Sequence, residues 1–314
     1  MKTVLTRSAT EAAAFIRRGG IVGFPTETVY GLGAAVFDEA TIRKIFDAKK
    51  RPADNPLIAH VSSVDQIAGL VLEIPAVAQK LIEAFFPGPL TLVLRKSARV
   101  PLLATAGLET IGVRMPRLVI ANEFLTACGV PLVAPSANLS GRPSPTTWQA
   151  VSEDLDGRID CILQGDPTEI GLESTVVDCT TDPPVLLRQG AISRESLSAI
   201  VPAIRVSAFD EADAPRSPGL KHKHYSPRAR VVVVDANAAF SATAGDAFIG
   251  LNAPATKLKI TKLCNSVEEY AGSLFEFFRE CDRSRVNRIF CESVVEDGLG
   301  AALMDRVRRA AVSD

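Results

Sequence analysis

The sequence has few of the residues that commonly bind metals, since its 314 residues include three histidines and six cysteines. The cysteines are dispersed and form no Cys-x-x-Cys pair, and the histidines are scattered too. Zinc sites in proteins use closely spaced Cys and His ligands. The sequence therefore disfavours a zinc site and favours reduced, buried thiols of the kind found in the cytosol.

Net charge and long hydrophobic runs are also lacking. The formal net charge is −1, which argues against nucleic-acid binding through bulk charge but leaves a local basic patch open. No apolar run reaches the length of about 20 residues that a membrane-spanning helix needs. The N-terminal residues contain no hydrophobic region followed by a cleavage site. We therefore expect a cytoplasmic protein that has no membrane segment.

Motifs for covalent catalysis and for phosphate-binding loops are absent as well. The sequence has no Gly-x-Ser-x-Gly elbow, no P-loop and no His-Glu-x-x-His motif. Any activity would therefore depend on how the side chains of several segments position bound substrates and neutralise their charges.

What the sequence does contain is an alternation of helical and strand patterns over its first two hundred residues. A capping box at residues 8–11 opens a helix that Gly19 and Gly20 are suited to end. The alternation predicts an α/β or α+β domain with a large mixed sheet over residues 1–205. Further helices are expected at 39–50, 75–86, 118–128 and 147–155, and strands at 19–26, 55–63, 89–97, 110–116, 131–138, 160–166, 174–180 and 184–190.

The periodicity stops near residue 205 and begins again near residue 229. Residues 206–228 have no amphipathic repeat and are predicted to be a linker. Residues 229–314 follow the order strand, short helix, strand, helix, strand and helix, which predicts a small Rossmann-like domain with a parallel sheet. Gly298 and Gly300 lack the third glycine of a dinucleotide-binding loop, so we expect them to pack at the start of a helix.

A basic segment at residues 48–56 is the first candidate site. Lys49 and Arg51 end a predicted helix, and prolines stiffen the following loop around Asn55. Cations at the end of a helix are favoured by its dipole, so a solvated basic end is one reading. A rigid loop that begins at two cationic side chains would instead suit a polyphosphate ligand.

The strand at residues 110–116 is the second candidate. Alternation places Thr110, Gly112 and Arg114 on one face of this strand. A glycine beside an arginine would let a ligand approach the backbone closely, and this gap favours a binding site. An arginine that serves only as an ion-pair partner is the alternative.

Polar residues elsewhere add to these two candidates. Ser136, Asn138 and Ser144 lie in a proline-rich loop whose backbone N–H groups could face an anion, although turn-rich connections of this kind are common. His60 and Arg188, at the ends of two apolar strands, are ambiguous individually. Together these groups end several strands of one sheet, where open α/β sheets bind ligands.

Several longer motifs make the chain similar to a known family. FPTETVYGLG, the Lys49-x-Arg51 pair followed by PADNPLIAH, and Ser136-x-Asn138 in APSANLSGRPSPT resemble the YrdC-domain family. LLRQGAI, SPGLKHKHYSP and EDGLGAALMDRVRRAA resemble the long, two-domain form of that family. The resemblance extends from about residue 8 to residue 311.

The resemblance implies a fold and a reaction. The fold is a twisted open sheet with a large cavity, followed by the small Rossmann-like domain. The implied enzyme is a nucleotidyltransferase that joins L-threonine, bicarbonate and ATP into threonylcarbamoyl-AMP and releases pyrophosphate. It would use Mg²⁺ on the ATP phosphates and no organic cofactor. A tRNA threonylcarbamoyl-transferase complex would then use the product for the t6A modification of tRNA.

The resemblance also implies ligand groups residue by residue. Lys49 and Arg51 are expected to be catalytic. The expected threonine site consists of Thr28, His60, Arg114, Ala134 and Ser174. The expected ATP site consists of Arg51, Asn55, Thr110, Ser136, Asn138, Ser144, Arg188 and Tyr225.

Residues 217–227, SPGLKHKHYSP, are rich in hydrogen-bond donors for a linker. A carbamate intermediate is unstable in water, so the cavity should close during turnover. We expect residues 221–225 to form a lid over the bound nucleotide; a solvated tether is the alternative.

Two other functions stay open. A related enzyme could adenylate carbamoyl phosphate, although such enzymes usually carry additional domains that are absent here. An RNA-binding module, with a weak tRNA contact, is the second alternative, and the net charge of −1 weighs against it.

Overall fold

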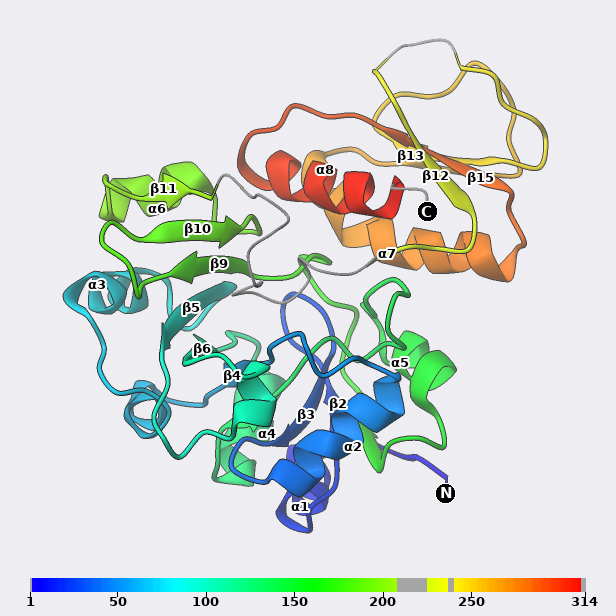
Figure 1. Cartoon of the computed structure of the whole chain (residues 1–314). Helices are drawn as coiled ribbons and strands as arrows, with labels where there is room; N and C mark the ends of the chain where they lie inside the picture. The colour runs from blue at the N-terminus through cyan, green and yellow to red at the C-terminus, as the bar shows by residue number, and fades with distance from the viewer. Residues whose placement is uncertain (1, 208–224, 237–239, 312–314) are drawn as a thin grey trace.

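The computed structural model describes residues 2–207, 225–236 and 240–311. Within these ranges an eleven-stranded mixed sheet and a separate four-stranded parallel sheet form two packed domains (Figure 1). This confirms the predicted fold class; the boundaries at residues 205 and 229 stay a prediction. None of the described helices is long and apolar enough to cross a membrane. All six cysteines are unpaired and buried, as expected.

The large sheet has the strand order β1-β8-β2-β3-β7-β4-β6-β5-β9-β10-β11. Its strands are β1 (Val4–Thr6), β2 (Val22–Phe24), β3 (Gly31–Ala35), β4 (Ile58–His60), β5 (Leu90–Arg95), β6 (Thr110–Arg114), β7 (Leu132–Val133), β8 (Cys161–Leu163), β9 (Thr175–Asp178), β10 (Val185–Arg188) and β11 (Arg205–Val206). The helices around it are α1 (Ala9–Arg17), α2 (Glu39–Lys49), α3 (Ala76–Phe85), α4 (Val119–Cys128), α5 (Trp148–Leu155), α6 (Arg194–Ile200) and the 3₁₀ helices η1 (Val64–Gly69) and η2 (Leu102–Thr105). The predicted cap of α1 is present, since Ser8 Oγ accepts the N–H of Glu11.

The two faces of the large sheet are covered unequally. Helices α2, α3, α5 and α6 pack on one face, in a core that includes Ile42, Leu81 and Val133. Only α1 and α4 contribute helices to the hydrophobic cluster on the other face, where Phe124 packs against Leu132. A helix is about 10 Å wide and strands lie about 4.8 Å apart, so two helices cover about four strands. Part of this second face is therefore left for a ligand.

Six elements of the first domain were missed by the sequence patterns: β1, β3, β11, α6 and the 3₁₀ helices η1 and η2. Strand β3 lies inside the sheet, between β2 and β7. Its sequence GLGAA lacks the β-branched and aromatic residues that favour strands. Its glycines pack closely against a neighbouring side chain, because a Cβ on Gly31 or Gly33 would lie 3.1–3.3 Å from the ring of Phe24. A neighbouring aromatic residue supplies the bulk that β3 itself lacks.

The second domain contains β12 (Arg230–Val234), β13 (Ala247–Gly250), β14 (Ile260–Leu263), β15 (Arg288–Glu292) and helices α7 (Val267–Arg283) and α8 (Gly298–Ala311). The patterns missed β14, a half-exposed edge strand. The short helix expected after β12 falls partly outside the described residues, and the flanking residues 235–236 and 240–246 are not helical. The packing role is confirmed for Gly300, since a Cβ there would lie 2.2 Å from the carbonyl oxygen of Val295, but it is wrong for Gly298, where nothing lies within 4 Å of an added Cβ.

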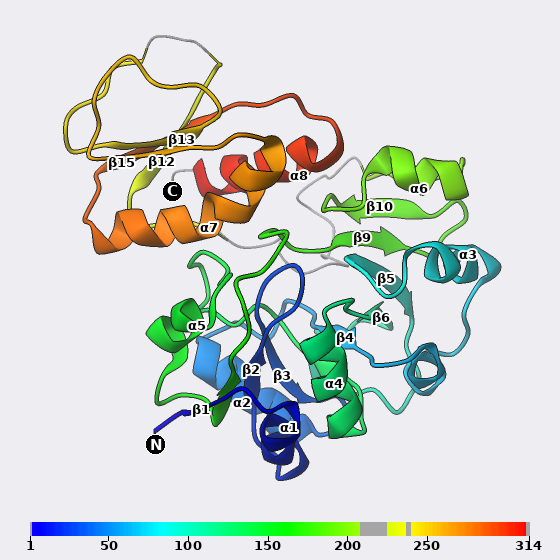
Figure 2. The same cartoon turned by 180° about the vertical axis from the view of Figure 1, so that it is seen from behind.

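The second domain lies against the loops of the first, with α7 at the boundary (Figure 2). Val29 and Leu172 of the first domain belong to the hydrophobic core of the second. Buried Arg279 of α7 donates to both carboxylate oxygens of Asp154, at 3.2 and 2.9 Å, and to the carbonyl of Pro143. The two domains therefore share buried apolar and charged contacts.

A close backbone approach between the domains depends on a glycine. Gly171 has a φ of +76°, and a Cβ there would lie 2.5 Å from Gly272 Cα on α7.

We expect Gly171→Ala to lower the free energy of unfolding by about 2–4 kcal/mol, through backbone strain and the interdomain clash. Gly129→Ala is the matched control, because its φ is +73° but nothing lies within 4 Å of the added methyl. Its expected cost is about 1 kcal/mol. Calorimetric unfolding of the two variants measures the difference, and equal losses would contradict the clash.

Candidate active site

A cavity lies on the incompletely covered face of the large sheet, with about 620 Å³ of empty space that includes solvent at its open side. The ends of β4 and β6, the loops after β2 and β7, the residues before β9 and the end of β10 contribute to its wall. His60 and Ala134 connect it to the apolar cluster under α1 and α4, because His60 meets the ring of Phe24 edge-on at 5.8 Å. Tyr225 closes the side nearest the second domain.

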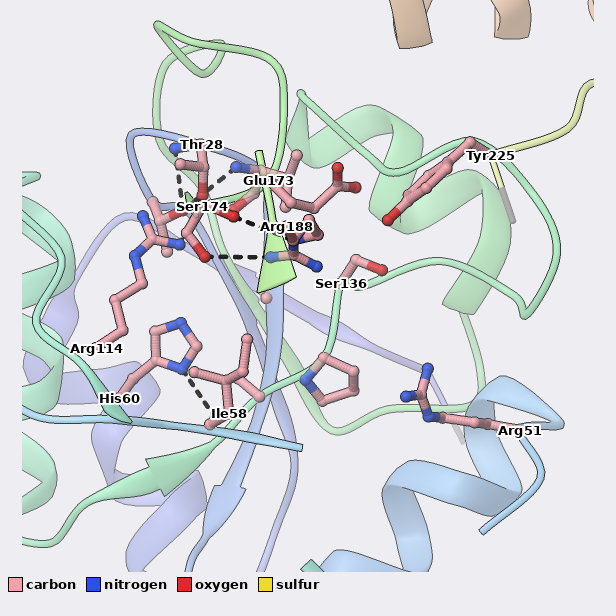
Figure 3. Close-up of a pocket in the computed structure, with 15 residues that line it drawn as sticks. Thr28, Arg51, Ile58, His60, Arg114, Ser136, Glu173, Ser174, Arg188 and Tyr225 are labelled. Atoms are coloured by element: carbon pink, nitrogen blue, oxygen red, sulfur yellow. Dashed lines mark hydrogen bonds between the residues drawn. The ribbon is translucent and has the colours of Figure 1, made fainter. Parts of the chain in front are cut away.

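The labelled side chains around this cavity fall into two groups (Figure 3). Thr28, His60, Arg114 and Ser174 gather at one end, whereas Arg51, Ser136 and Tyr225 lie at the other. Arg188 and Glu173 lie between the two groups. This separation would suit a substrate pair, one small and polar and the other extended and anionic.

Arg114 is held by two acceptors from the loop after β2. Its Nη2 donates to Glu27 Oε1 at 2.6 Å and its Nη1 donates to Thr28 Oγ1 at 2.8 Å. Both members of the Arg114–Glu27 ion pair are buried. Arg114 therefore forms a buried ion pair, and the same side chain also lines the cavity.

His60 lies beside Arg114 on the neighbouring strand, because β4 and β6 pair in parallel with His60 level with Arg114. Its Nδ1 lies 3.2 Å from the carbonyl oxygen of Ile58. Burial and the adjacent guanidinium lower the pKa of His60 to about 3, so the imidazole is neutral at physiological pH. A neutral ring can donate through one nitrogen and accept through the other.

Ser174 and Arg188 join the first group to the centre of the cavity. Ser174 Oγ lies 2.8 Å from Thr91 Oγ1, and it accepts from Arg188 Nη2 at 3.2 Å. Arg188 Nε also donates to the carbonyl of Ser174 at 3.1 Å. Burial lowers the pKa of Arg188, although a guanidinium remains charged at neutral pH.

In the basic segment at the end of α2, Lys49 and Arg51 lie in different surroundings. Arg51 lines the cavity and donates through Nη2 to the carbonyls of Asn55 and Pro56. Lys49 is fully buried beneath the loop after β7, where its Nζ donates at 2.5 Å to the carbonyls of Ser136 and Asn138. Burial and the charge of Arg51 hold the pKa of Lys49 well below its usual value. The reading of this segment as a solvated helix end is correct for the exposed Lys50, whereas it is wrong for Lys49, which is buried, and for Arg51, which is half-buried and lines the cavity.

Five predicted site residues do not line the cavity, and four of them hydrogen-bond to residues that do. Asn138 accepts from Ser136 Oγ at 2.6 Å, and Ser144 donates to the wall residue Glu173 at 2.6 Å. The carbonyl of Asn55 accepts from Arg51, whereas Thr110 is at the start of β6, at the opposite end of that strand from Arg114. Lys49, as described above, supports the loop that presents Ser136.

The sequence reasoning missed both carboxylates of the site. Glu27 and Glu173 are buried, and each pairs with an arginine that is far away in sequence. No spacing pattern links such residues, although Glu27 lies within the recognised FPTETVYGLG motif.

The role predicted for Gly112 is wrong. A Cβ on Gly112 would lie 3.1 Å from Thr91 Cγ2 and 3.3 Å from Ile58 Cγ1. The space beside this glycine is therefore occupied by side chains of the neighbouring strands, and Gly112 does not line the cavity.

The predicted lid is only partly within the structure. Residues 217–224 lie outside the described ranges, whereas residues 225–227 are described. The ring of Tyr225 stacks on Phe275 of α7 at 5.4 Å, and the N–H of Ser226 donates to the carbonyl of Gly141. This end of the linker therefore contacts both domains.

The fold and the site together define an α/β protein with a buried, arginine-rich cavity at the boundary of two domains. A family model described as "Telomere recombination" matches residues 14–190. A second, described as "Threonylcarbamoyl-AMP synthase, C-terminal domain", matches residues 192–312. The threonylcarbamoyl-AMP synthase of Pyrococcus abyssi is 44% identical, over 95% of this chain and 92% of that protein. The protein of the same name from Bacillus subtilis is 40% identical, over 96% and 92%.

Solved structures agree with this relationship. The crystal structure of P. abyssi Sua5 complexed with L-threonine superposes with a TM-score of 0.90 at 41% identity, covering 99% of this chain and 97% of that one. E. coli YciO, at 24% identity and a TM-score of 0.52, covers 60% of the chain and shares the fold. The chain belongs to the threonylcarbamoyl-AMP synthase family.

The low pKa of His60 has a measurable consequence. The unfolded chain takes up a proton at His60 near pH 6.5, whereas the folded protein does not until about pH 3. Protonation of the unfolded state therefore lowers the stability of the fold as the pH falls below 6.5. Side-chain ¹⁵N NMR, with the His60 signals assigned by their loss in His60→Asn, should show a neutral ring from pH 7.5 to pH 5. An inflection near pH 6.5 would contradict the burial of this ring.

Proposed function

We propose that this cavity joins L-threonine, bicarbonate and ATP into threonylcarbamoyl-AMP and pyrophosphate. The observation that carries the proposal is the arrangement of two polar groups in one cavity of a chain that superposes on a threonine-bound relative. The reaction needs one small amino acid and one anionic nucleotide side by side, and the cavity has one group of side chains for each.

The end of the cavity that holds Arg114 suits threonine. We assign Thr28, His60, Arg114, Ala134 and Ser174 to this substrate. The Arg114 guanidinium would bind the carboxylate while Glu27 balances its charge. The neutral ring of His60 and the hydroxyls of Thr28 and Ser174 offer partners for the hydroxyl of the substrate.

The end that holds Arg51 suits ATP. We assign Arg51, Asn55, Thr110, Ser136, Asn138, Ser144, Arg188 and Tyr225 to the nucleotide. Arg51 and Arg188 reach the cavity from different segments, so they can neutralise different phosphates. Lys49, which we group with Arg51 as catalytic, would act by holding the loop of Ser136 and Asn138 in place.

The chemistry needs orientation and charge neutralisation rather than a protein nucleophile. Threonine's amine and bicarbonate combine to a carbamate with loss of water, and a carbamate oxygen then attacks the α-phosphorus of ATP. The bond from the α-phosphorus to the bridging oxygen breaks, and pyrophosphate leaves with that electron pair. Aligned reactants and cations that meet the developing negative charge are the main sources of rate in such a displacement.

Magnesium fits the site as a companion of ATP. Glu173 is the one carboxylate among the residues that line this cavity, and it is paired with Arg306. In the described part of the chain no three His, Cys, Asp or Glu side chains form a metal-binding group. A magnesium ion would therefore be held by the phosphates, where it supplies additional charge neutralisation.

We place the reaction in the cytoplasm, upstream of a tRNA threonylcarbamoyl-transferase complex. Residues 1–205 would hold the catalytic cavity, residues 206–228 would join and cover it, and residues 229–314 would hold the cover in place. The product is a mixed anhydride that hydrolyses readily, so the acceptor enzyme should take it up soon after release. A weak direct contact with tRNA belongs to the same proposal.

Product analysis tests the activity. With L-threonine, ¹⁴C-bicarbonate and ATP, we expect a labelled adenylate that forms in equal amount with pyrophosphate. Valine has the shape of threonine without the hydroxyl, so its rate of pyrophosphate release should be lower by about 10²-fold or more. Equal rates with valine, or pyrophosphate release without a labelled product, would refute the proposal.

Arg114→Lys tests the threonine end. A lysine ammonium cannot hold Glu27, Thr28 and a carboxylate in the geometry of a planar guanidinium. We expect the Kd for threonine to rise by about 30-fold or more, equivalent to about 2 kcal/mol, with a smaller change in ATP affinity. Isothermal titration with each substrate separates the two effects. Full activity in the lysine variant would reduce Arg114 to a structural ion pair.

A further inference from the structure

An arginine of the second domain reaches the wall of the cavity in the first. Arg306 lies on α8, its side chain is fully buried, and its Nε donates to Glu173 Oε2 at 2.8 Å. Its Nη2 donates to the carbonyl of Gln189 at 3.0 Å, one residue after Arg188.

Glu173 would be unfavourable in a cavity for ATP if its charge were uncompensated. Its carboxylate lies between the two groups of cavity residues, and it accepts a hydrogen bond from Ser144 at 2.6 Å. Burial alone would raise the pKa of this carboxyl, but Arg306 and Arg188 outweigh that effect and hold the pKa below its usual value. The group is therefore an anion beside the phosphates that the proposed function places there.

Arg306 also contacts the end of the linker. Its guanidinium lies 5.5 Å from the centre of the Tyr225 ring, which also stacks on Phe275. Its Nη1 pairs with Asp305, which in turn pairs with Arg309. Asp305 is thus compensated from its own helix, and the charge of Arg306 is available to Glu173.

We propose that Arg306 is a positioning residue for ATP which the second domain supplies to the catalytic cavity. It neutralises Glu173, and this leaves the charge of Arg188 to the phosphates instead of to a neighbouring carboxylate. Through the same guanidinium it holds the ring of Tyr225 at the cavity mouth. The second domain is then a part of the ATP site, and the inference rests on the function proposed above.

Charge compensation predicts a specific pattern of ATP affinities. Arg306→Ala leaves a buried carboxylate beside the phosphates, so the Kd for ATP should rise by roughly 30-fold or more. The affinity for threonine should change less, by about threefold at most. Glu173→Gln added to Arg306→Ala removes the repulsion and should recover at least about tenfold of the lost affinity. Arg306→Lys keeps the positive charge and should also recover part of it.

Equilibrium binding of ATP, together with KM and kcat for pyrophosphate release, measures these effects in the full-length protein. Arg283→Ala is the matched control, because it removes another interdomain contact, with Glu153, that does not reach the cavity. Thermal unfolding shows whether each variant folds. If Arg306→Ala is unfolded, Arg306→Lys still tests the inference, because an ATP affinity equal to that of Arg306→Met in a folded protein would rule out a role for the charge.

The results separate this inference from the proposed function. A wild-type protein that neither binds ATP nor releases pyrophosphate would refute the function. An active wild type whose ATP affinity is unchanged in Arg306→Ala would overturn only the role of Arg306. A double variant that is no better than Arg306→Ala would also overturn charge compensation, because it would leave packing alone to explain the loss.

Discussion

The burial of charge is the constraint on which this site depends. Moving an ion out of water costs several kcal/mol, so a buried cation must have acceptors before any ligand arrives. The cations in and beside the cavity have different acceptors. Arg114 has a carboxylate, Arg51 and Arg188 have backbone carbonyls, and Lys49 has the loop that it supports. Arg51 and Arg188 also line the cavity, where their guanidinium groups can meet an anion.

This requirement explains why the site combines segments that are distant in sequence. A single loop of arginines would repel itself, whereas strand ends of one sheet bring cations and acceptors together from several directions. The unequal covering of the sheet then provides the space, since α1 and α4 shield only part of one face. The geometry of the cavity is thus a consequence of the strand order as much as of its polar residues.

The sequence predicted those parts of the structure that local patterns determine. Hydrophobic alternation placed Arg114 and Ile111 on opposite faces of β6, and the capping box marked the start of α1. Long motifs pointed to the segments that line the cavity. Pairs such as Glu27 with Arg114, or Glu173 with Arg306, were beyond local patterns, because their members come together only through tertiary packing. Strand β3 was missed for the same reason, since the bulk that stabilises its glycines belongs to Phe24.

The buried pairs between the domains bear on geometry more than on stability. Replacing a buried ion pair with well-packed apolar residues is often neutral or stabilising, so Arg279–Asp154 and Arg306–Glu173 are weak reasons for the domains to associate. The apolar contacts of Val29, Leu172 and Tyr225 provide a stronger reason. Ion pairs instead raise the free energy of every arrangement of the domains in which the two charges are separated but still buried, because each charge then lacks a partner. In this chain they restrict the second domain to the orientation in which α8 presents a cation to the cavity, and an apolar interface alone would not impose that orientation.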